Sequence, residues 1–369
     1  MKLKLHFLLL FTVFYSFSQN ALLSKEAKIS IFTCGNGEEL YTTFGHTAIR
    51  IQDETNNLDI VYNYGQFDFR EGNFYAKFVK GDLQYFIGVC SFDDFIYEYQ
   101  FGGREVVEQT LNLKPLQKQK LLDELNASLY SDERHYTYKF IDRNCTTMVV
   151  EKINAILNKP IIEKIDDKTI SYRQVLYPRF ENYFWYKLGI NIIFGTKVDA
   201  KSEKLFLPTE FLNSLDKAVV DGKPLVSKKQ IVVKSTQPNI KFRFLDSSYF
   251  VALVLLIVLV LNKKWATYSY LILAGLMGSF LCLVGFYSLH EELLWNYNAL
   301  LFNPLFLVLP FLQNLKRYKT VLLLCFSMLV LYLIWMINKP HLLLMSPFIM
   351  AHFVIFWQLK KGTKSKVIV

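Results

Sequence analysis

The sequence predicts a two-part protein, in which an exported α+β domain is followed by an all-α bundle of membrane-spanning helices. Apolar residues make up 52% of the 369 residues and concentrate after Asp246. Before that point, short runs rich in β-branched and aromatic residues are typical of strands, and they are mixed with amphipathic helical patterns. The N-terminus is basic and then apolar, which is typical of an exported chain.

The N-terminal segment has the three parts of a signal peptide. Lys2 and Lys4 precede an apolar run, and Ser16-Phe17-Ser18 is a small-x-small pattern that signal peptidase accepts. No cysteine follows closely, so we expect no lipid attachment there. The expected organisation is a signal peptide at 1–18, a periplasmic domain at 19–222, a strand-bearing linker at 223–246 and a transmembrane domain at 247–369.

Five apolar segments in the second half are each predicted to span the membrane. The first and third are short for a hydrocarbon layer of roughly 30 Å, so they need snorkelling lysines and interfacial aromatic residues. The segments are 249–261, 268–287, 300–312, 320–337 and 342–359.

The distribution of positive charge supports one topology. After an exported domain the chain enters the membrane from the periplasmic side, and the loops that then face the cytoplasm are the basic ones. Together with Lys2 and Lys4 these loops carry eleven positive charges, so the rest of the chain is close to −1 within the net charge of +10, and nucleic-acid binding loses its support. We expect a multi-pass protein of the inner membrane. The inward charges are Lys263, Lys264, Lys316, Arg317, Lys319, Lys360, Lys361, Lys364 and Lys366.

The exported half mixes predicted strands and helices. The expected strands are 28–34, 47–52, 60–64, 83–90 and 105–113, and the expected helices are 115–129 and 145–157.

Cys145 is the first candidate for chemistry. It heads a predicted helix, where the macrodipole and unpaired N–H groups favour a thiolate. His46 opens a predicted strand about a hundred residues earlier and can accept the thiol proton. This pair predicts covalent acyl transfer.

Each member of the pair also has a structural interpretation. Cys145 could be a small buried apolar residue, and His46 could bond a backbone carbonyl at a strand start. Of the other exported cysteines, Cys90 ends a strand-like run and Cys34 is ambiguous, so a disulfide between them stays open.

A histidine that opens a strand, followed later by a cysteine that opens a helix, resembles the circularly permuted papain-like fold of the lecithin:retinol acyltransferase group. In that group a polar residue on the next strand orients the histidine. The matching strand makes Asn63 our choice, which would complete a Cys-His-Asn site. Its rivals are Tyr62, Tyr64, Asp68 and Asp142, and Asn63 could instead be a turn-bonding residue.

A wider resemblance covers nearly the whole chain. The segments TCGNGEELYTTFGHTAIR (33–50), VYNYGQFDF (61–69), NFYAKF (73–78) and NCTT (144–147) resemble the Bacteroidetes Lnb family. The resemblance implies a periplasmic domain, five spanning helices and lipoprotein N-acylation. It also implies a phospholipid acyl donor and a diacylglyceryl lipoprotein acceptor.

Two other classes of protein remain open. A membrane-tethered cysteine peptidase or amidase would use the same dyad, and a non-enzymatic membrane scaffold could retain a degenerate thiol fold. A single membrane span would be enough to anchor a peptidase. A bundle of several helices therefore favours an enzyme with lipid substrates.

Several polar residues are candidates for substrate binding. The N–H of Thr146 could face an oxyanion, Asn144 precedes the thiol, and Arg50 could bind phosphate or be paired, as could Arg173. His290 and Asn296 are expected at the outer membrane face, where they could contact a lipid headgroup or bond between helices. The scheme needs no cofactor. His135, His341 and His352 have no partner spacing that predicts a metal.

Overall fold

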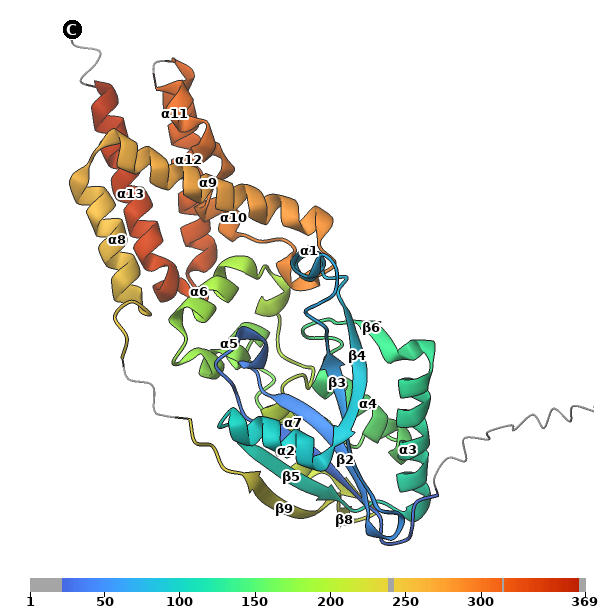
Figure 1. Cartoon of the computed structure of the whole chain (residues 1–369). Coiled ribbons are helices and arrows are strands. Elements are labelled where there is room, and N and C mark those ends of the chain that lie inside the picture. Colours follow the sequence, from blue (N-terminus) through green and yellow to red (C-terminus); the bar gives the residue numbers. More distant parts are fainter. Residues whose placement is uncertain (1–21, 238–241, 314, 365–369) are drawn as a thin grey trace, which may run out of the picture.

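The computed structural model describes residues 22–237, 242–313 and 315–364. Figure 1 shows an α/β part, formed by the N-terminal half of the chain, and a helical part that lies at one end of it. The predicted signal peptide at 1–18 lies outside the described residues, as does Lys366 of the basic tail.

The α/β part is built on a seven-stranded sheet in the order β6-β4-β3-β2-β1-β5-β9, and all its pairings are antiparallel. The five predicted strands form its centre. A separate two-stranded ribbon joins β7 and β8. The strands are β1 Lys28–Cys34, β2 His46–Asp53, β3 Leu58–Gln66, β4 Gln84–Ser91, β5 Val106–Leu111, β6 His135–Thr137, β7 Val219–Val220, β8 Lys223–Pro224 and β9 Val226–Val233.

Helices cover both faces of the sheet. Helices α3 (Pro115–Tyr130), α4 (Cys145–Leu157) and α7 (Pro208–Lys217) pack on one face, where Ile29, Ile49 and Tyr62 belong to the same buried cluster. Helix α2 (Phe92–Phe101) covers the other face over Phe32, Ala48 and Val61. The other helices of this part are α1 (Phe74–Lys80), α5 (Tyr172–Leu176) and α6 (Phe184–Ile193).

The sheet takes in part of the stretch that we expected to be a linker. Strand β9 lies in that stretch and pairs with β5 as the edge strand of the main sheet. The β-branched residues Ile231, Val232 and Val233 favour a strand, and Val233 is buried against the sheet. The α/β part therefore extends to Val233.

The membrane half does not consist of the five long helices that the sequence predicts. Three of its helices, α9 (Lys264–Tyr287), α12 (Arg317–Met336) and α13 (Leu342–Lys364), are long and apolar enough to cross a membrane. Helix α8 (Ser248–Leu261) has only 14 residues. The predicted third span is divided into α10 (Asn298–Leu301), a 3-10 turn at Pro304–Leu307 and α11 (Leu309–Leu312). Pro304 and Pro310 lack the N–H that a continuous helix needs.

The two possible disulfide partners are far apart. Cys34 lies in β1 and Cys90 in β4, with β2 and β3 between them in the sheet. Three strand spacings of about 4.8 Å separate them by roughly 14 Å, well beyond the reach of a disulfide. Both cysteines are free thiols.

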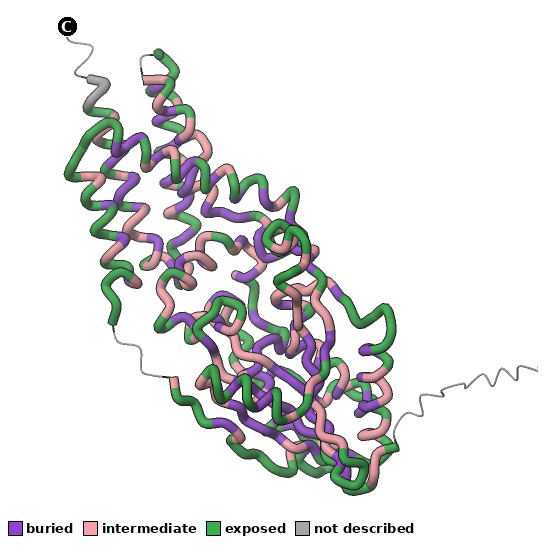
Figure 2. Tube along the Cα trace, viewed as in Figure 1, coloured by how far each residue is buried: buried purple, intermediate pink, exposed green. Residues whose placement is uncertain are grey.

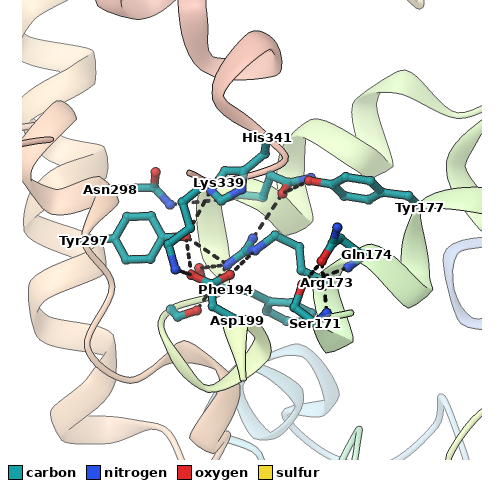
Figure 3. A network of polar contacts seen from close by, with 12 residues as sticks. Ser171, Arg173, Gln174, Tyr177, Phe194, Asp199, Tyr297, Asn298, Lys339 and His341 are labelled. Atoms are coloured by element: carbon teal, nitrogen blue, oxygen red, sulfur yellow. Dashed lines mark hydrogen bonds and ion pairs between the residues drawn. The ribbon is translucent and has the colours of Figure 1, made fainter. Parts of the chain in front are cut away.

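A buried polar network joins the α/β part to the membrane half (Figure 3). Arg173 of α5 is fully buried and donates to Asp199 at 2.6 Å, to Asn191 at 3.1 Å and to the Tyr297 hydroxyl at 3.3 Å. Asp199 also accepts from Tyr297 at 2.8 Å and pairs with Lys339 at 3.0 Å. Tyr297 and Lys339 belong to the membrane half, so this network fixes the α/β part relative to the membrane helices.

We expect Arg173→Met to lower the free energy of unfolding by about 3 kcal/mol, because removing one member of a buried ion pair leaves Asp199 short of its main partner. The loss of stability would be measured as a fall in Tm relative to the wild-type protein in the same detergent. Arg70→Met is the control, since the Arg70 side chain is 90% exposed in its pair with Asp68 and should matter little. Equal changes in Tm for both variants would show that the Arg173–Asp199 network does not stabilise the protein.

Candidate active site

The start of α4, where Cys145 lies, is fixed by the residue before it. The Oδ1 atom of Asn144 accepts from the N–H groups of Thr146 and Thr147 at 2.9 and 3.0 Å. Its Nδ2 atom donates to the carbonyls of Phe140 and Phe206 at 2.8 and 2.9 Å. These four bonds use the full hydrogen-bonding capacity of the amide. Asn144 therefore positions the helix and keeps no polar group for a substrate.

The Cys145 thiol lies against the ends of β2 and β3. The N–H groups of Thr47, Thr146 and Cys145 and the Thr146 hydroxyl lie close enough to the sulfur to act against the rise of its pKa. The Thr47 and Thr146 hydroxyls are 3.0 Å apart. On the β3 side, a Cβ atom at Gly65 would stand 3.6 Å from Cys145 Cβ. Gly65 has φ +87°, a left-handed conformation that favours glycine, so the backbone of β3 can bend beside the thiol.

His46 is held by Asn63 on the neighbouring strand. Asn63 pairs with Ala48, which lies two residues from His46 on the same face of β2. His46 Nε2 lies 3.1 Å from Asn63 Oδ1. Asn63 Nδ2 donates to the Val61 carbonyl at 3.3 Å and to Cys90 Sγ at 3.6 Å, which orients the amide oxygen toward the ring. Because that oxygen can only accept, Nε2 carries the ring proton and Nδ1 is left as the basic nitrogen.

Both titratable groups are neutral at neutral pH. Burial raises the pKa of the Cys145 thiol above its ordinary value, although the surrounding donors act in the opposite direction. The expectation that the helix start would favour a thiolate is thus not met, because desolvation outweighs the donors. Burial also lowers the pKa of His46 to about 4; its bond to Asn63 opposes this shift, and the nearby Arg104 guanidinium adds to it.

Cys145 and His46 meet at the N-terminal end of β2. The N–H of Thr47, which reaches the sulfur, belongs to the residue directly after His46. Within the described ranges, the hydrogen bond of the His46 ring goes to Asn63, and none joins the ring to the Cys145 sulfur. Catalytic hydrogen bonds are often long without substrate and tighten when it binds. The structure therefore brings all three residues to one end of two strands, but it does not join the His46 ring to the Cys145 sulfur by a hydrogen bond.

The four rivals of Asn63 are engaged with partners other than His46. Tyr62 donates to Asn126, Tyr64 packs beside Tyr136, Asp68 pairs with Arg70, and Asp142 pairs with Lys197 and Lys204.

Arg50, a candidate phosphate ligand, is neutralised inside the protein. It donates to both carboxylate oxygens of Asp59 at 2.7 and 2.6 Å and to Glu108 at 3.1 Å. Its guanidinium also lies 3.5 Å from the centre of the Phe92 ring. The structure thus gives Arg50 the paired role that the sequence left open.

His290 and Asn296 join the two halves of the protein. His290 Nε2 lies 2.8 Å from the carbonyl of Phe78. Asn296 Nδ2 donates to the carbonyls of Ile192 and Ile193 at 2.8 and 2.7 Å. Both side chains bond to the backbone of the α/β part, so they dock the membrane half against it.

Two neighbours of the site were not predicted. Arg104 donates to the Gly35 carbonyl at 3.0 and 2.9 Å and lies close enough to His46 to lower its pKa. Tyr138 Cε2 lies 3.9 Å from the position of a Cβ atom at Gly65, on the side of the thiol. The pairing of β1 with β5 brings Arg104 to the site, and no motif marks such a residue.

Among the residues that the structure describes, no group of three or more His, Cys, Asp or Glu side chains could hold a metal ion. His341 and His352 lie in the membrane half, where each bonds a tyrosine hydroxyl, at 3.0 and 2.8 Å.

The fold and the site define a class of membrane protein whose α/β domain outside the helices places a cysteine at a helix start near a His–Asn pair. Residues 14–176 match the family model described as the Lnb N-terminal periplasmic domain, a range that includes His46, Asn63 and Cys145. The chain therefore contains an Lnb-type N-terminal domain, which confirms the resemblance drawn from the motifs. No curated protein and no solved structure matches the chain.

Proposed function

We propose that the protein is a lipoprotein N-acyltransferase. It would move a fatty acyl chain from a phospholipid, through a thioester on Cys145, to the α-amino group of a diacylglyceryl-cysteine lipoprotein. The observation that carries this proposal is the thiol at the start of α4, held against the peptide after His46, whose ring is bonded to Asn63. The membrane half supports it further, because both substrates are lipids and can approach from the bilayer.

The wider organisation is part of the same proposal. The catalytic domain, 19–222 together with β9, is a permuted papain-like domain in the periplasm, with a signal peptide before it and the helical half in the inner membrane. Three long helices, the short α8 and the broken α10–α11 segment make five crossings. The basic loops near Lys263 and Lys316 then face the cytoplasm.

In the first step, Nδ1 of His46 accepts the thiol proton as Cys145 Sγ attacks the ester carbonyl carbon of the phospholipid. The tetrahedral intermediate collapses by breaking the bond to the glycerol oxygen. His46 returns its proton to that oxygen, so a lysophospholipid leaves and a thioester remains. A neutral thiol and a neutral imidazole are the correct starting forms for this transfer.

In the second step, the lipoprotein amine attacks the thioester. An α-amino group has a reference pKa of about 8, so part of it is neutral at physiological pH. His46 takes a proton from the attacking nitrogen and gives it to the departing Cys145 sulfur. The amide forms, the free thiol is regenerated, and no cofactor enters the balance.

Backbone N–H groups at the thiol can stabilise the oxyanion in both steps. Thr146, our first choice of donor, already gives its N–H to Asn144 at 2.9 Å. The N–H groups of Cys145 and Thr47 also lie beside the sulfur, and they are the other candidate donors to the oxyanion. One good donor is worth about 3 kcal/mol of transition-state stabilisation.

Mass spectrometry of lipoprotein N-terminal peptides, from a strain that relies on this protein, tests the function. The wild-type protein should yield triacylated peptides, and its depletion should leave diacylated ones. Diacylated peptides in both cases would reject the activity. Release of cell-wall peptide fragments in place of acyl transfer would favour a peptidase or amidase.

Asn63 is proposed to position His46. We expect Asn63→Ala to lower kcat about 10- to 100-fold with little change in KM, because the ring loses its orienting bond. Asn63→Asp should instead shift the acidic limb of the rate profile upward, since a carboxylate favours the imidazolium. Asn126→Ala, which removes a partner of Tyr62 only, is the control. An unchanged kcat for Asn63→Ala would show that the bond has no part in catalysis.

The pH dependence follows from the pKa of His46, which burial lowers to about 4. Protonated His46 cannot act as a base, so activity should be lost as the pH falls through about 4, and not through the ordinary value of 6.5. The measurement is kcat/KM for the phospholipid donor as a function of pH. This quantity reports the pKa values of the free enzyme and does not depend on the pKa of the lipoprotein amine. A half-maximal rate near pH 6.5 would contradict a desolvated histidine that stays neutral down to about pH 4.

A further inference from the structure

A strip of aromatic side chains runs over the surface of the α/β part beside the membrane half. Phe67 and Phe69 follow β3, and Phe74, Tyr75 and Phe78 belong to α1. Tyr41 completes the strip from the turn before β2, with its ring centre 5.7 Å from that of Phe67. Phe67 and Phe69 are 4.9 Å apart, and Phe69 and Phe74 are 5.0 Å apart. The rings therefore form one continuous surface.

The strip is uncovered by the described chain. The exposed fraction is 57% for Tyr41, 58% for Phe69, 77% for Tyr75 and 43% for Phe78. Helix α1 buries none of its seven residues, and Figure 2 shows it as exposed and intermediate. The lysines of α1 are paired, Lys77 with Glu71 and Lys80 with Asp82, so the helix offers apolar contact more than free charge. Such a patch marks a surface that binds an apolar partner.

The outer end of the strip is fixed to the end of a membrane-crossing helix. Ser288, directly after α9, donates its hydroxyl to the Val79 carbonyl at 2.9 Å. The Leu289 N–H donates to the Lys80 carbonyl at 2.6 Å. Figure 1 shows α1 beside the C-terminal end of α9. The strip thus lies at the level where α9 leaves the bilayer, the depth at which aromatic residues are enriched in membrane proteins.

The inner end of the strip leads to the thiol. The ring centres of Phe67 and Tyr85 are 5.2 Å apart, and those of Tyr85 and Tyr138 are 4.4 Å apart. Tyr138 Cε2 and Cys145 Cβ both lie within 4 Å of the position of a Cβ atom at Gly65. A continuous series of ring contacts therefore connects α1 at the membrane surface with Tyr138, whose ring lies near Gly65, as Cys145 Cβ does.

We propose that the strip formed by Tyr41, Phe67, Phe69, Phe74, Tyr75 and Phe78 binds the acyl chain of a membrane phospholipid and guides it from the periplasmic leaflet to Cys145. The inference rests on the proposed acyltransferase function and adds the route of the donor. A long acyl chain suits the strip because each buried CH₂ group contributes about 0.8 kcal/mol and needs no polar partner.

The test uses the full-length protein in bilayer nanodiscs and two acyl donors. One donor is a long-chain phosphatidylethanolamine in the bilayer, and the other is a water-soluble dihexanoyl phospholipid. We expect Phe69→Ser combined with Tyr75→Ser to slow thioester formation at Cys145 by at least about 10-fold with the bilayer donor, and to leave the soluble donor unaffected. The matched control is Tyr97→Ser with Phe101→Ser on α2, whose side chains are 69% and 85% exposed. The control pair should change neither rate.

The outcomes separate the route from the function. Equal rates for the variant and the wild-type protein with the bilayer donor would overturn the route while thioester formation still supported the acyltransferase. A parallel loss with both donors would also overturn it, because the soluble donor needs no passage from the bilayer. Failure of the wild-type protein to form a thioester with either donor would remove the function and the route together.

Photo-crosslinking gives a second test of where the acyl chain binds, and it does not depend on catalytic turnover. A phosphatidylethanolamine with a photoreactive group in its acyl chain should label the peptide containing Phe67 to Phe78 in the full-length Cys145→Ala protein. Labelling confined to the membrane helices would contradict the proposed route.

Discussion

Cys145→Ala is expected to reduce N-acylation by roughly 10⁴-fold or more, because loss of a nucleophile removes the covalent pathway altogether. Cys145→Ser should be similarly inactive, since a serine hydroxyl is a far weaker acid than the thiol and His46 is a weak base. The measurement is transfer of a labelled acyl chain from phosphatidylethanolamine to a diacylglyceryl peptide in proteoliposomes.

The control for this substitution is Cys282→Ser, which changes an exposed cysteine in α9 far along the chain from the site. It should keep full activity. Normal membrane insertion of the Cys145→Ala protein would show that the loss is chemical. Transfer at the wild-type rate by that protein would rule out Cys145 as the nucleophile and favour a scaffold.

His46→Ala is expected to lower the acylation rate by about 10²- to 10⁴-fold, the usual contribution of a general base. The neutral Cys145 thiol makes this dependence strong, because its raised pKa leaves little thiolate without a base. Alkylation of Cys145 by iodoacetamide at neutral pH gives a separate reading of thiolate formation and should slow in the same variant.

His135→Ala is the matched control, because His135 is an exposed histidine in β6. Neither its acyl transfer nor its alkylation should change. If His46→Ala retained wild-type acyl transfer, another group would have to be the base, and the proposed dyad would be wrong.

Much of the α/β part could be predicted from local patterns. The strand at Lys28–Cys34 and the helix at Cys145–Leu157 have the predicted bounds, because alternation and helical periodicity are strong there. The edge position of β9 could not be predicted, since it depends on pairing with β5, more than a hundred residues earlier. Apolar content alone does not reveal the break in the third span, which follows from the prolines at 304 and 310.

The candidate site could be predicted only as residue types. Cys145 lies at the start of α4, His46 at the start of β2 and Asn63 in β3, and strand register explains how Asn63 reaches the His46 ring. The raised pKa of the thiol could not be predicted, because desolvation depends on the packed surroundings. The position of Arg104 next to His46 likewise depends on the pairing of β1 with β5.

The most direct test of the account is to trap the acyl-enzyme. The full-length protein would be incubated with phosphatidylethanolamine carrying a labelled acyl chain, and its peptides analysed by mass spectrometry. We predict one labelled acyl group on Cys145, labile to hydroxylamine and lost when a diacylglyceryl peptide is added. Formation of triacylated product with no acyl group on Cys145, or with the label at another residue, would contradict the account.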